Sequence, residues 1–385
     1  MDRYFAKEDR VLSTFRTVRR QLGAALVAMV ASGVPCAAQV TVAAASTPPD
    51  DTPNIKVGVT IFADYTVNLE PKITDADGNE VTFSAFQIGR SYINVTGNIS
   101  HSIAFRVTPD ITRETGVGSA LNGSYTFRLK YAYAQWNLDD HMSKGSYARF
   151  GMQQNPYHEF FDAVYRYRFQ GTLFVEREGP LAGVPYIASA DVGAAFHYNL
   201  PQNYGDIQTG FFNGENYNRP EVNDQKAFML RGTLRPFHTH SFLRGLRLTG
   251  FIDQDAYVKN ANRTRVVFTT TFEHAYANAA FEYIASSDRT SATRNEIDGQ
   301  GWSVFVTPKT ARGWEGLLRY DHVVPNTDVD NQVRTRTIAG VAYWFPHQGN
   351  VSTALMLDYD HATFDGFSPS QPTQKRLAVH ALVNF

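Results

Sequence analysis

The sequence has almost no cysteine and no long apolar runs after its first few dozen residues. Cys36 is the only cysteine among 385 residues. If residues 1–38 are removed on export, the remaining chain contains none, which excludes disulfide bonds and thiolate metal sites. Beyond Val34, no apolar run reaches the ~18 residues that a transmembrane helix requires. We therefore expect neither a cysteine framework nor a membrane-spanning helix in that part of the chain.

An excess of charge of either sign is also missing. The 36 Lys and Arg residues nearly match the 37 Asp and Glu residues, and the formal net charge is −1. Nucleic-acid binding depends on a basic surface that neutralises phosphates. We therefore expect no nucleic acid among the partners.

The motifs of common enzymes are absent as well. No glycine-rich phosphate loop lies between a strand and a helix, and no Gly-x-Ser-x-Gly elbow occurs. Enzymes embedded in barrels use Ser, His and acidic residues. Ser286, Asp288 and His322 supply those residue types, but nothing in the sequence brings them together. We expect a protein that is not an enzyme and that needs no cofactor.

Two short segments contain residue types that bind metal ions. The segment DADGNE at 75–80 is rich in oxygen ligands, but it lacks the distal glutamate of a calcium-binding EF-hand loop. His238 and His240 could supply two imidazoles, but no third ligand is in register with them. We predict that residues 75–80 form an acidic turn and that His238 and His240 lie in a solvated turn. We expect neither segment to bind a metal ion.

The first 54 residues have the composition of an export signal and a linker. Arg19 and Arg20 precede an apolar stretch at 22–34, and Ala37 and Ala38 offer a cleavage site. We predict a signal peptide at 1–38, with a membrane anchor as the alternative. Residues 39–54 contain Pro48 and read as a flexible N-terminal lead-in.

Apolar and polar residues alternate through most of residues 55–385, and no segment is predicted to be helical. Leu377 and Val379 fall on one face of the last segment, whereas Arg376 and His380 fall on the other. A soluble β-sandwich would alternate too, but its strands average about five or six residues. The segments here are about 9 to 14 residues long, which suits tilted membrane strands of roughly 9 to 11. The pattern therefore predicts an all-β fold, a transmembrane antiparallel β-barrel occupying 55–385.

The alternating segments number about sixteen, with fourteen or eighteen as alternatives. With both ends of the barrel chain on the periplasmic side, connections that follow odd-numbered strands are external and should be longer. The connection 259–263 is short for its side. The predicted strands are 55–68, 83–97, 101–111, 124–138, 146–153, 186–199, 207–213, 225–236, 245–258, 264–273, 276–286, 300–308, 313–323, 334–345, 351–361 and 375–385.

The connection at about 154–185 is the longest and is rich in aromatic and charged residues. Long loops with side chains of this kind are rarely simple linkers, and a wide water-filled barrel needs narrowing. We predict that this third external loop folds inward, although it could instead cap the barrel or pack on a neighbouring subunit. The candidate residues of the pore constriction and lumen are Arg166, Arg168, Glu176, Arg177 and Glu178 on the loop, and Arg106, Arg128, Lys130, Arg231 and Arg235 on the strands.

Several short motifs resemble the phosphate-selective porin O and P family of bacterial outer membranes. They cover most of the chain in order: FQIGR at 86–90, FRVTPD at 105–110, YAY at 131–133, GMQQ at 151–154, DVG at 191–193, FFNG at 211–214 and RGTLRP at 231–236. The resemblance implies a sixteen-stranded homotrimeric porin. It also implies that the terminal Phe385 is part of the signal read by the barrel-assembly machinery.

Phosphate selectivity does not fit the charges on the predicted pore. An anion filter needs a row of Lys or Arg with few acids nearby, because a carboxylate cancels the attracting field. The proposed loop mixes Arg166 and Arg168 with Glu176 and Glu178. We predict an outer-membrane channel for passive diffusion of small hydrophilic solutes or ions, surrounded by outer-membrane lipid, with at most weak anion preference. The alternative is a structural or adhesion barrel with a plugged lumen.

Overall fold

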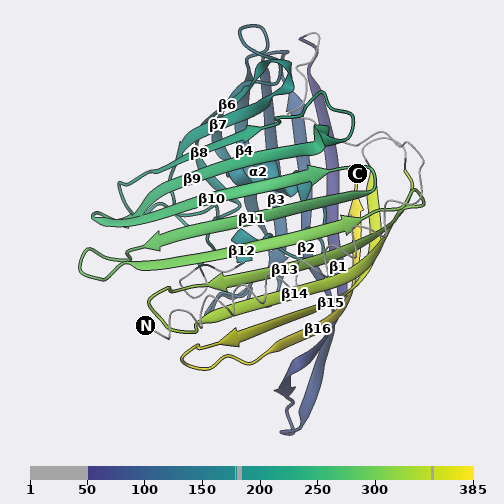
Figure 1. Ribbon diagram of the computed structural model, residues 1–385, viewed down its shortest axis with the longest axis vertical. Coiled ribbons are helices and arrows are strands. Elements are labelled where there is room, and N and C mark those ends of the chain that lie inside the picture. Colours follow the sequence, from purple (N-terminus) through teal and green to yellow (C-terminus); the bar gives the residue numbers. More distant parts are fainter. Residues whose placement is uncertain (1–50, 178, 180–183, 348–350) are drawn as a thin grey trace, which may run out of the picture. The chain divides into compact units, whose positions relative to one another are not determined.

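The computed structural model describes residues 51–385, apart from 178, 180–183 and 348–350. The predicted signal peptide at 1–38 lies outside the described residues, as does the predicted lead-in up to residue 50. Within the described part of the chain, sixteen strands form a closed antiparallel barrel (Figure 1). Each strand pairs with its neighbours in sequence, and the first strand pairs with the last. The predicted fold class, a sixteen-stranded antiparallel barrel, is confirmed.

The strand bounds follow the predicted segments closely, and every predicted strand has its counterpart. The strands are β1 (Asn54–Thr74), β2 (Glu80–Asn98), β3 (Ile103–Arg113), β4 (Tyr125–Asn137), β5 (Tyr147–Gln154), β6 (Ala190–Asn199), β7 (Gly205–Phe212), β8 (Ala227–Leu234), β9 (Leu246–Val258), β10 (Ala261–Glu273), β11 (Ala277–Asp288), β12 (Ile297–Pro308), β13 (Trp314–Val324), β14 (Val333–Trp344), β15 (Ser352–Asp365) and β16 (Gln374–Asn384).

The connections at the two rims of the barrel differ in length, and we name the rims accordingly. The long-loop rim carries the connections that follow odd-numbered strands, including 114–124, 155–189 and 213–226. The short-turn rim carries those that follow even-numbered strands, including 99–102 and 274–276. The connection formed by Lys259 and Asn260 is an exception, because it is short although it lies on the long-loop rim. The sequence predicted a short connection at this place.

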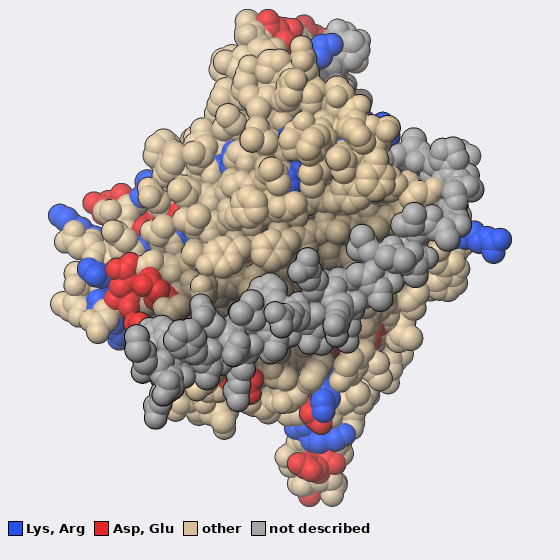
Figure 2. All heavy atoms as spheres, viewed as in Figure 1, with Lys and Arg blue, Asp and Glu red and all other residues tan. Residues whose placement is uncertain are grey.

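The polarity of the barrel is inverted relative to a soluble protein. Large apolar side chains such as Phe268 and Leu357 are about half exposed on the outer face, at 48% and 53%. Charged side chains such as Arg265 and Asp288 are fully buried on the inner face. Figure 2 shows few Lys, Arg, Asp or Glu side chains over the middle of the strands in view, and most of them near the strand ends. This arrangement suits an apolar surrounding and a polar interior.

One predicted strand face is wrong. The alternation of Phe127 and Leu129 with Arg128 and Lys130 predicts that Tyr131 and Tyr133 also lie on the outer face. In the structure Thr108 pairs with Tyr131, and the next residue, Pro109, pairs with Leu129, which leaves Lys130 as an extra residue. This β-bulge shifts the alternation by one position. As a result, Lys130 and Tyr131 are consecutive and both buried.

Two short helices lie within the connection 155–189, where the sequence predicted none. They are α2 (Pro156–Val164) and α3 (Phe174–Arg177). The side chain of Asn155 accepts a hydrogen bond from the backbone N–H of Tyr157 at 2.8 Å, and Pro156 takes the first helical position. Both features favour a helix start at this point.

Side chains of this connection form a hydrophobic cluster with the inner face of the barrel. The ring of Tyr157 lies 5.5 Å from that of Phe251 on β9, and the ring of Phe161 lies 6.1 Å from that of Phe305 on β12. Ile284 and Leu317 on the neighbouring strands belong to the same buried cluster. The apolar residues on the inner faces of β9 to β13 are therefore covered by protein. Among the described residues, no helix is both long and apolar enough to cross a membrane.

Candidate functional site

The connection 155–189 is anchored to the barrel wall by hydrogen bonds at several points. The hydroxyl of Tyr157 donates to Oε1 of Glu282 on β11 at 2.6 Å and lies 2.7 Å from Oγ1 of Thr269 on β10. Farther along, the hydroxyl of Tyr167 donates to Oε2 of Glu315 on β13 at 2.9 Å. These buried hydroxyl–carboxylate bonds fix α2 and the segment after it against one side of the wall.

Backbone carbonyls of the same connection accept from wall arginines. Nη1 of Arg319 donates to the carbonyl of Thr172 at 2.9 Å, and Nε of Arg265 donates to the carbonyl of Tyr186 at 2.8 Å. Both arginines are buried. The wall therefore supplies hydrogen-bond donors to loop carbonyls that are buried away from water and would otherwise have no partner.

Glu176 on α3 brings together charged residues from the connection and from the opposite wall. Its carboxylate pairs with Arg168 and lies 3.8 Å from Nε2 of His158 and 3.7 Å from Nη1 of Arg90 on β2. Arg168 also lies 3.4 Å from Asp162. Because the same connection is bonded to β10, β11 and β13, the contact with Arg90 shows that it reaches across to β2.

Three predicted lumen residues lie near this crossing, on the inner faces of β3 and β4. Arg128 pairs with Asp110 at 2.9 Å, and Nη2 of Arg106 donates to Asn94 at 2.9 Å. The ammonium of Lys130 lies 5.4 Å from the ring centre of Tyr92. This wall is polar and basic, with aromatic rings between the charges.

The two remaining predicted strand residues lie at different places in the barrel. Arg231 on β8 pairs with Asp206 and lies 5.4 Å from the ring of Phe160 on α2. Arg235 follows the end of β8 and donates to Asn203, so it lies at the short-turn rim, away from the connection.

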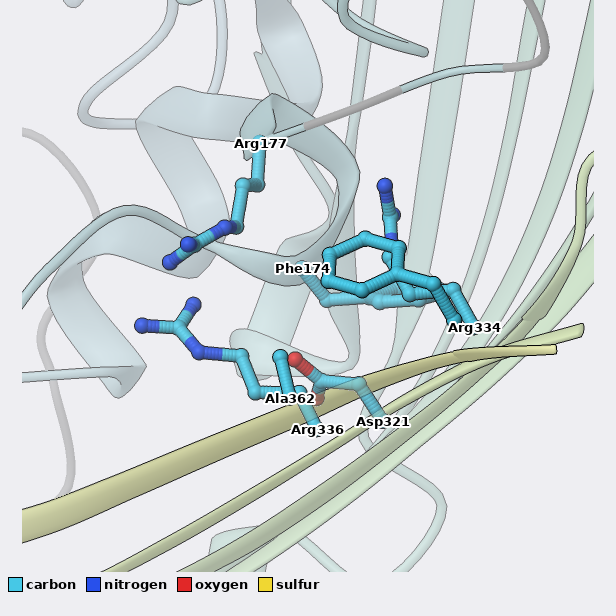
Figure 3. A pocket seen from close by; sticks show the side chains of 7 residues that line it. Phe174, Arg177, Asp321, Arg334, Arg336 and Ala362 are labelled. Atoms are coloured by element: carbon cyan, nitrogen blue, oxygen red, sulfur yellow. The ribbon is translucent and has the colours of Figure 1, made fainter. Parts of the chain in front are cut away.

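Arg166, in the part of the connection that lies against β13, pairs with the wall. It lies 3.2 Å from Glu315 and 4.1 Å from the ring centre of Trp344. Arg177 on α3 lines a pocket against β13 to β15 (Figure 3). Glu178 lies outside the described residues.

Several arginines of the inner face are not among the pore residues predicted from the sequence. Arg334 and Arg336 on β14 alternate with threonines, as in RTRT at 334–337, so the outer positions lack the strong apolar signal that marks a strand face. Arg90 was noted only as part of a short motif. A search for Arg at spacing two within predicted strands would have found the pair on β14.

No group of three or more His, Cys, Asp or Glu side chains suited to a metal ion is present among the residues that the structure describes. At 75–80, the carboxylate of Asp75 accepts from the backbone N–H groups of Asp77 at 3.0 Å and Asn79 at 2.8 Å. That carboxylate is therefore engaged in closing the turn between β1 and β2.

The fold is similar to that of bacterial outer-membrane porins. An anion-selective porin from Comamonas acidovorans matches with a TM-score of 0.59 at 10% identity, over 87% of this chain and 100% of that chain. OmpF of Salmonella typhi, in complex with daunomycin, gives 0.59 at 10% identity, over 86% and 97%. OmpT of Vibrio cholerae, in a trimer form, gives 0.56 at 13% identity, over 87% and 100%.

Sequence comparison adds no closer relationship. No protein-family model and no curated protein matches the chain. The structural likeness therefore establishes the porin-type fold and no more. Membership of the phosphate-selective porin O and P family, which the short motifs resemble, stays a prediction.

Proposed function

We propose that this chain is a bacterial outer-membrane porin, a passive diffusion channel for small hydrophilic solutes or ions. The observation that carries the proposal is the inverted polarity of a closed barrel of sixteen strands. Apolar side chains face outward, where lipid would contact them, and charged side chains face the interior. Barrels of this size enclose an aqueous channel.

The connection 155–189 forms the constriction of this channel. Its attachment to β10, β11 and β13 and its contact with Arg90 support this role, because a segment held at both places must divide the interior. Arg168 and Glu176 lie at the crossing, facing the wall that carries Arg106 and Lys130. Solutes pass through the part of the interior that the connection leaves open.

The selectivity of the channel is at most weakly anionic. Most basic side chains near the crossing already have acidic neighbours, as Arg128 has Asp110 and Arg168 has both Asp162 and Glu176. Opposed charges cancel the field that would select one ion. This argues against a phosphate-specific filter.

The partners that we propose are outer-membrane lipid, two further copies of the chain and the barrel-assembly machinery. The trimer form of the Vibrio cholerae OmpT, which shares the fold, supports a homotrimer. The ring of Phe385 is 59% exposed, while the backbone of this residue pairs with that of Val59. The side chain of Phe385 is thus accessible, which supports its proposed role in the assembly signal.

The second candidate is a structural barrel whose lumen is plugged. The 3.7 Å contact between Arg90 and Glu176 favours it, because this contact joins the connection to the far wall. The hydrophobic cluster beneath the connection fills a further part of the interior.

The reversal potential in a planar bilayer under a potassium chloride gradient tests the proposed selectivity. Purified, refolded protein should give a small reversal potential, and added phosphate should cause little block. Strong block at low phosphate concentration would instead establish the phosphate-specific channel that the motifs resemble.

A single substitution tests the constriction. Glu176→Gln removes the carboxylate that offsets Arg90 and Arg168, so the reversal potential should move toward anion preference. Glu296→Gln, on the connection 289–296 at the long-loop rim, removes the same charge at an exposed site and should leave the potential unchanged. If both variants match the parent, the connection does not line the path of the ions.

A further inference from the structure

Arg336, on the inner face of β14, lines a small pocket between the barrel wall and α3 (Figure 3). The helix contributes Phe174 and Arg177 to the lining, and the neighbouring strands contribute Asp321 and Ala362. The space that these side chains leave is about that of one water molecule. An occupant is therefore a single water molecule or a monatomic ion, and nothing larger fits.

Arg336 uses only one edge of its guanidinium group to pair with the protein. Nε donates to Oδ1 of Asp360 at 2.8 Å, and Nη2 donates to Oδ2 of the same carboxylate at 2.5 Å. Because a guanidinium group is planar, the third nitrogen, Nη1, points away from Asp360. Nη1 is buried and has no hydrogen-bond partner among the residues that the structure describes. A buried donor on a charged group is costly to leave without an acceptor.

The neighbouring buried arginine on β13 has no such nitrogen. Nε and Nη2 of Arg319 donate to Asp321, both at 2.8 Å, and Nη1 donates to the carbonyl of Thr172 at 2.9 Å. Asp321 also accepts from the hydroxyl of Ser303 at 2.7 Å. The protein thus supplies acceptors for every guanidinium nitrogen of Arg319, whereas Nη1 of Arg336 needs an acceptor that is not part of the described chain.

Three arginines share two carboxylates at this place. Arg319 pairs with Asp321, whereas Arg336 and Arg376 both pair with Asp360. One positive charge among these five side chains therefore has no carboxylate of its own. Since Arg336 is only 3% exposed, bulk water does little to stabilise this charge, and burying such a charge is costly. An anion at Nη1 compensates it, which a water molecule does not.

Two further arginines line the pocket and do not enter this count. Arg177 and Arg334 have interactions of their own. The argument for an anion depends only on Nη1 of Arg336 and on the charges of the five side chains named above.

The size of the pocket selects among anions. Phosphate, sulfate and carboxylates each contain several heavy atoms, and the space of one water molecule excludes them. A halide ion is a single atom that accepts hydrogen bonds from any direction. The acid in the lining, Asp321, is already neutralised by Arg319, and the remaining contacts are the ring of Phe174 and the methyl group of Ala362.

We propose that this pocket binds a single halide ion, chloride, which accepts a hydrogen bond from Nη1 of Arg336. The ion is a fixed part of the folded barrel and balances the third arginine of the group. It is not a solute in transit, so the site does not require that the barrel conduct.

Heat unfolding of the refolded full-length barrel in detergent tests the site, with the loss of heat-modifiable migration as the readout. The midpoint is measured in sodium chloride, sodium bromide and sodium gluconate at matched ionic strength. Gluconate is too large for the pocket. Because a ligand that binds only the folded state stabilises it, the midpoint should rise with chloride or bromide by at least about 2 °C and then level off.

Two substitutions remove the site in different ways. Ala362 lies opposite Arg336 in the pairing of β14 with β15, so Ala362→Val fills the space and leaves every charge in place. Arg336→Lys keeps the charge beside Asp360 but has no second nitrogen for the ion. Each variant is compared with itself in gluconate, so a lower stability of its own does not matter. Both should lose the shift caused by chloride.

A matched control changes an arginine elsewhere. Arg289→Lys, on the exposed 289–296 connection, should keep the full chloride shift. Equal midpoints of the parent protein in chloride and gluconate, or a chloride shift that Ala362→Val retains, would overturn the proposal and leave a water molecule as the occupant.

Anomalous diffraction from crystals grown in sodium bromide tests the site without any substitution. A bromide peak should lie within hydrogen-bond distance of Nη1 of Arg336. A crystal that shows ordered bromide elsewhere and none at this nitrogen would contradict the site.

Bilayer recordings separate this inference from the proposed function. A barrel with the chloride shift that never conducts would contradict the porin proposal and leave the halide site in place. A barrel that conducts but shows no chloride shift would contradict the site alone.

Discussion

Buried charges on the inner face of the barrel are held in close pairs. Arg265 and Asp288 are both fully buried, and their two hydrogen bonds measure 2.9 and 2.7 Å. Tyr257 donates a further hydrogen bond to the same carboxylate at 2.7 Å. Removing one partner of such a pair leaves the other charge buried without compensation, which costs far more than breaking an exposed pair.

We therefore predict that Asp288→Asn lowers the free energy of unfolding by about 3 kcal/mol. The measurement is a urea titration of the refolded barrel in lipid. Glu296→Gln is the matched control, because Glu296 pairs with Arg289 at an exposed site, and its loss should change the free energy by less than about 0.5 kcal/mol. Equal effects of the two substitutions would show that the buried pair contributes no more to the free energy of unfolding than the exposed pair.

A second prediction concerns His101, in the turn between β2 and β3. Its Nδ1 lies 2.6 Å from Asp51 and its Nε2 lies 2.9 Å from Asp140. Hydrogen bonds to Asp51 first, and then to Asp140, raise the pKa of His101 above its ordinary value. The resulting stabilisation is complete below the ordinary pKa of about 6.5 and is lost as pH rises through the raised folded value.

The NMR titration of the His101 ring checks this prediction. The pKa should exceed that of an unstructured histidine and should fall on Asp51→Asn. Asp77→Asn, at the opposite rim of the barrel, should leave it unchanged. A His101 ring that titrates at the ordinary value in the parent protein would contradict the role of the two carboxylates.

The helix α2 is joined to the barrel wall through a buried hydroxyl group. Tyr157 is fully buried, and its hydroxyl donates to Glu282 on β11. If the hydroxyl of Tyr157 is removed, the carboxyl group of Glu282 loses this hydrogen-bond donor inside the barrel. Leaving such a group unsatisfied costs roughly 1–3 kcal/mol.

Tyr157→Phe should therefore lower the free energy of unfolding by about 2 kcal/mol and increase the current noise of the open channel, as the connection 155–189 loosens. Tyr186→Phe is the control. Tyr186 is a buried tyrosine of the same connection, and its hydroxyl has no hydrogen-bond partner among the described residues. If the two variants Tyr157→Phe and Tyr186→Phe have the same current noise and the same free energy of unfolding, the hydroxyl of Tyr157 does not hold the connection in place.

Strands were predictable from sequence, whereas their irregularities were not. Alternation is a local signal, and it placed all sixteen strands. The bulge at Lys130 depends on how β4 pairs with β3, which the alternation within β4 alone does not determine. The helix α2 had a local signal in Asn155 and Pro156, a capping residue followed by proline, which alternation alone does not use.

The candidate site was predictable only as a set of residues. The sequence identified Arg168 and Glu176 as members of a long, charged connection. It could not bring Glu176 to Arg90, since that contact joins α3 to a strand more than eighty residues earlier. It also could not form the pocket at Arg336, which requires β13 to β15 to lie beside α3.

At the scale of the whole molecule, closure of the barrel separates an interior from an exterior. β1 pairs with β16 from Thr60 opposite Asn384 to Glu70 opposite Lys375, so no free sheet edge remains between the first and last strands. Lipid would therefore contact only the apolar outer face. The polar interior serves as a channel only if water and solutes pass through it.

The stepwise conductance of single barrels inserted into a planar bilayer tests this central claim most directly. We predict discrete, long-lived current steps in potassium chloride, each marking the insertion of an open channel. Folded, heat-modifiable protein that enters the bilayer and gives no current would contradict the channel and establish the plugged barrel in its place.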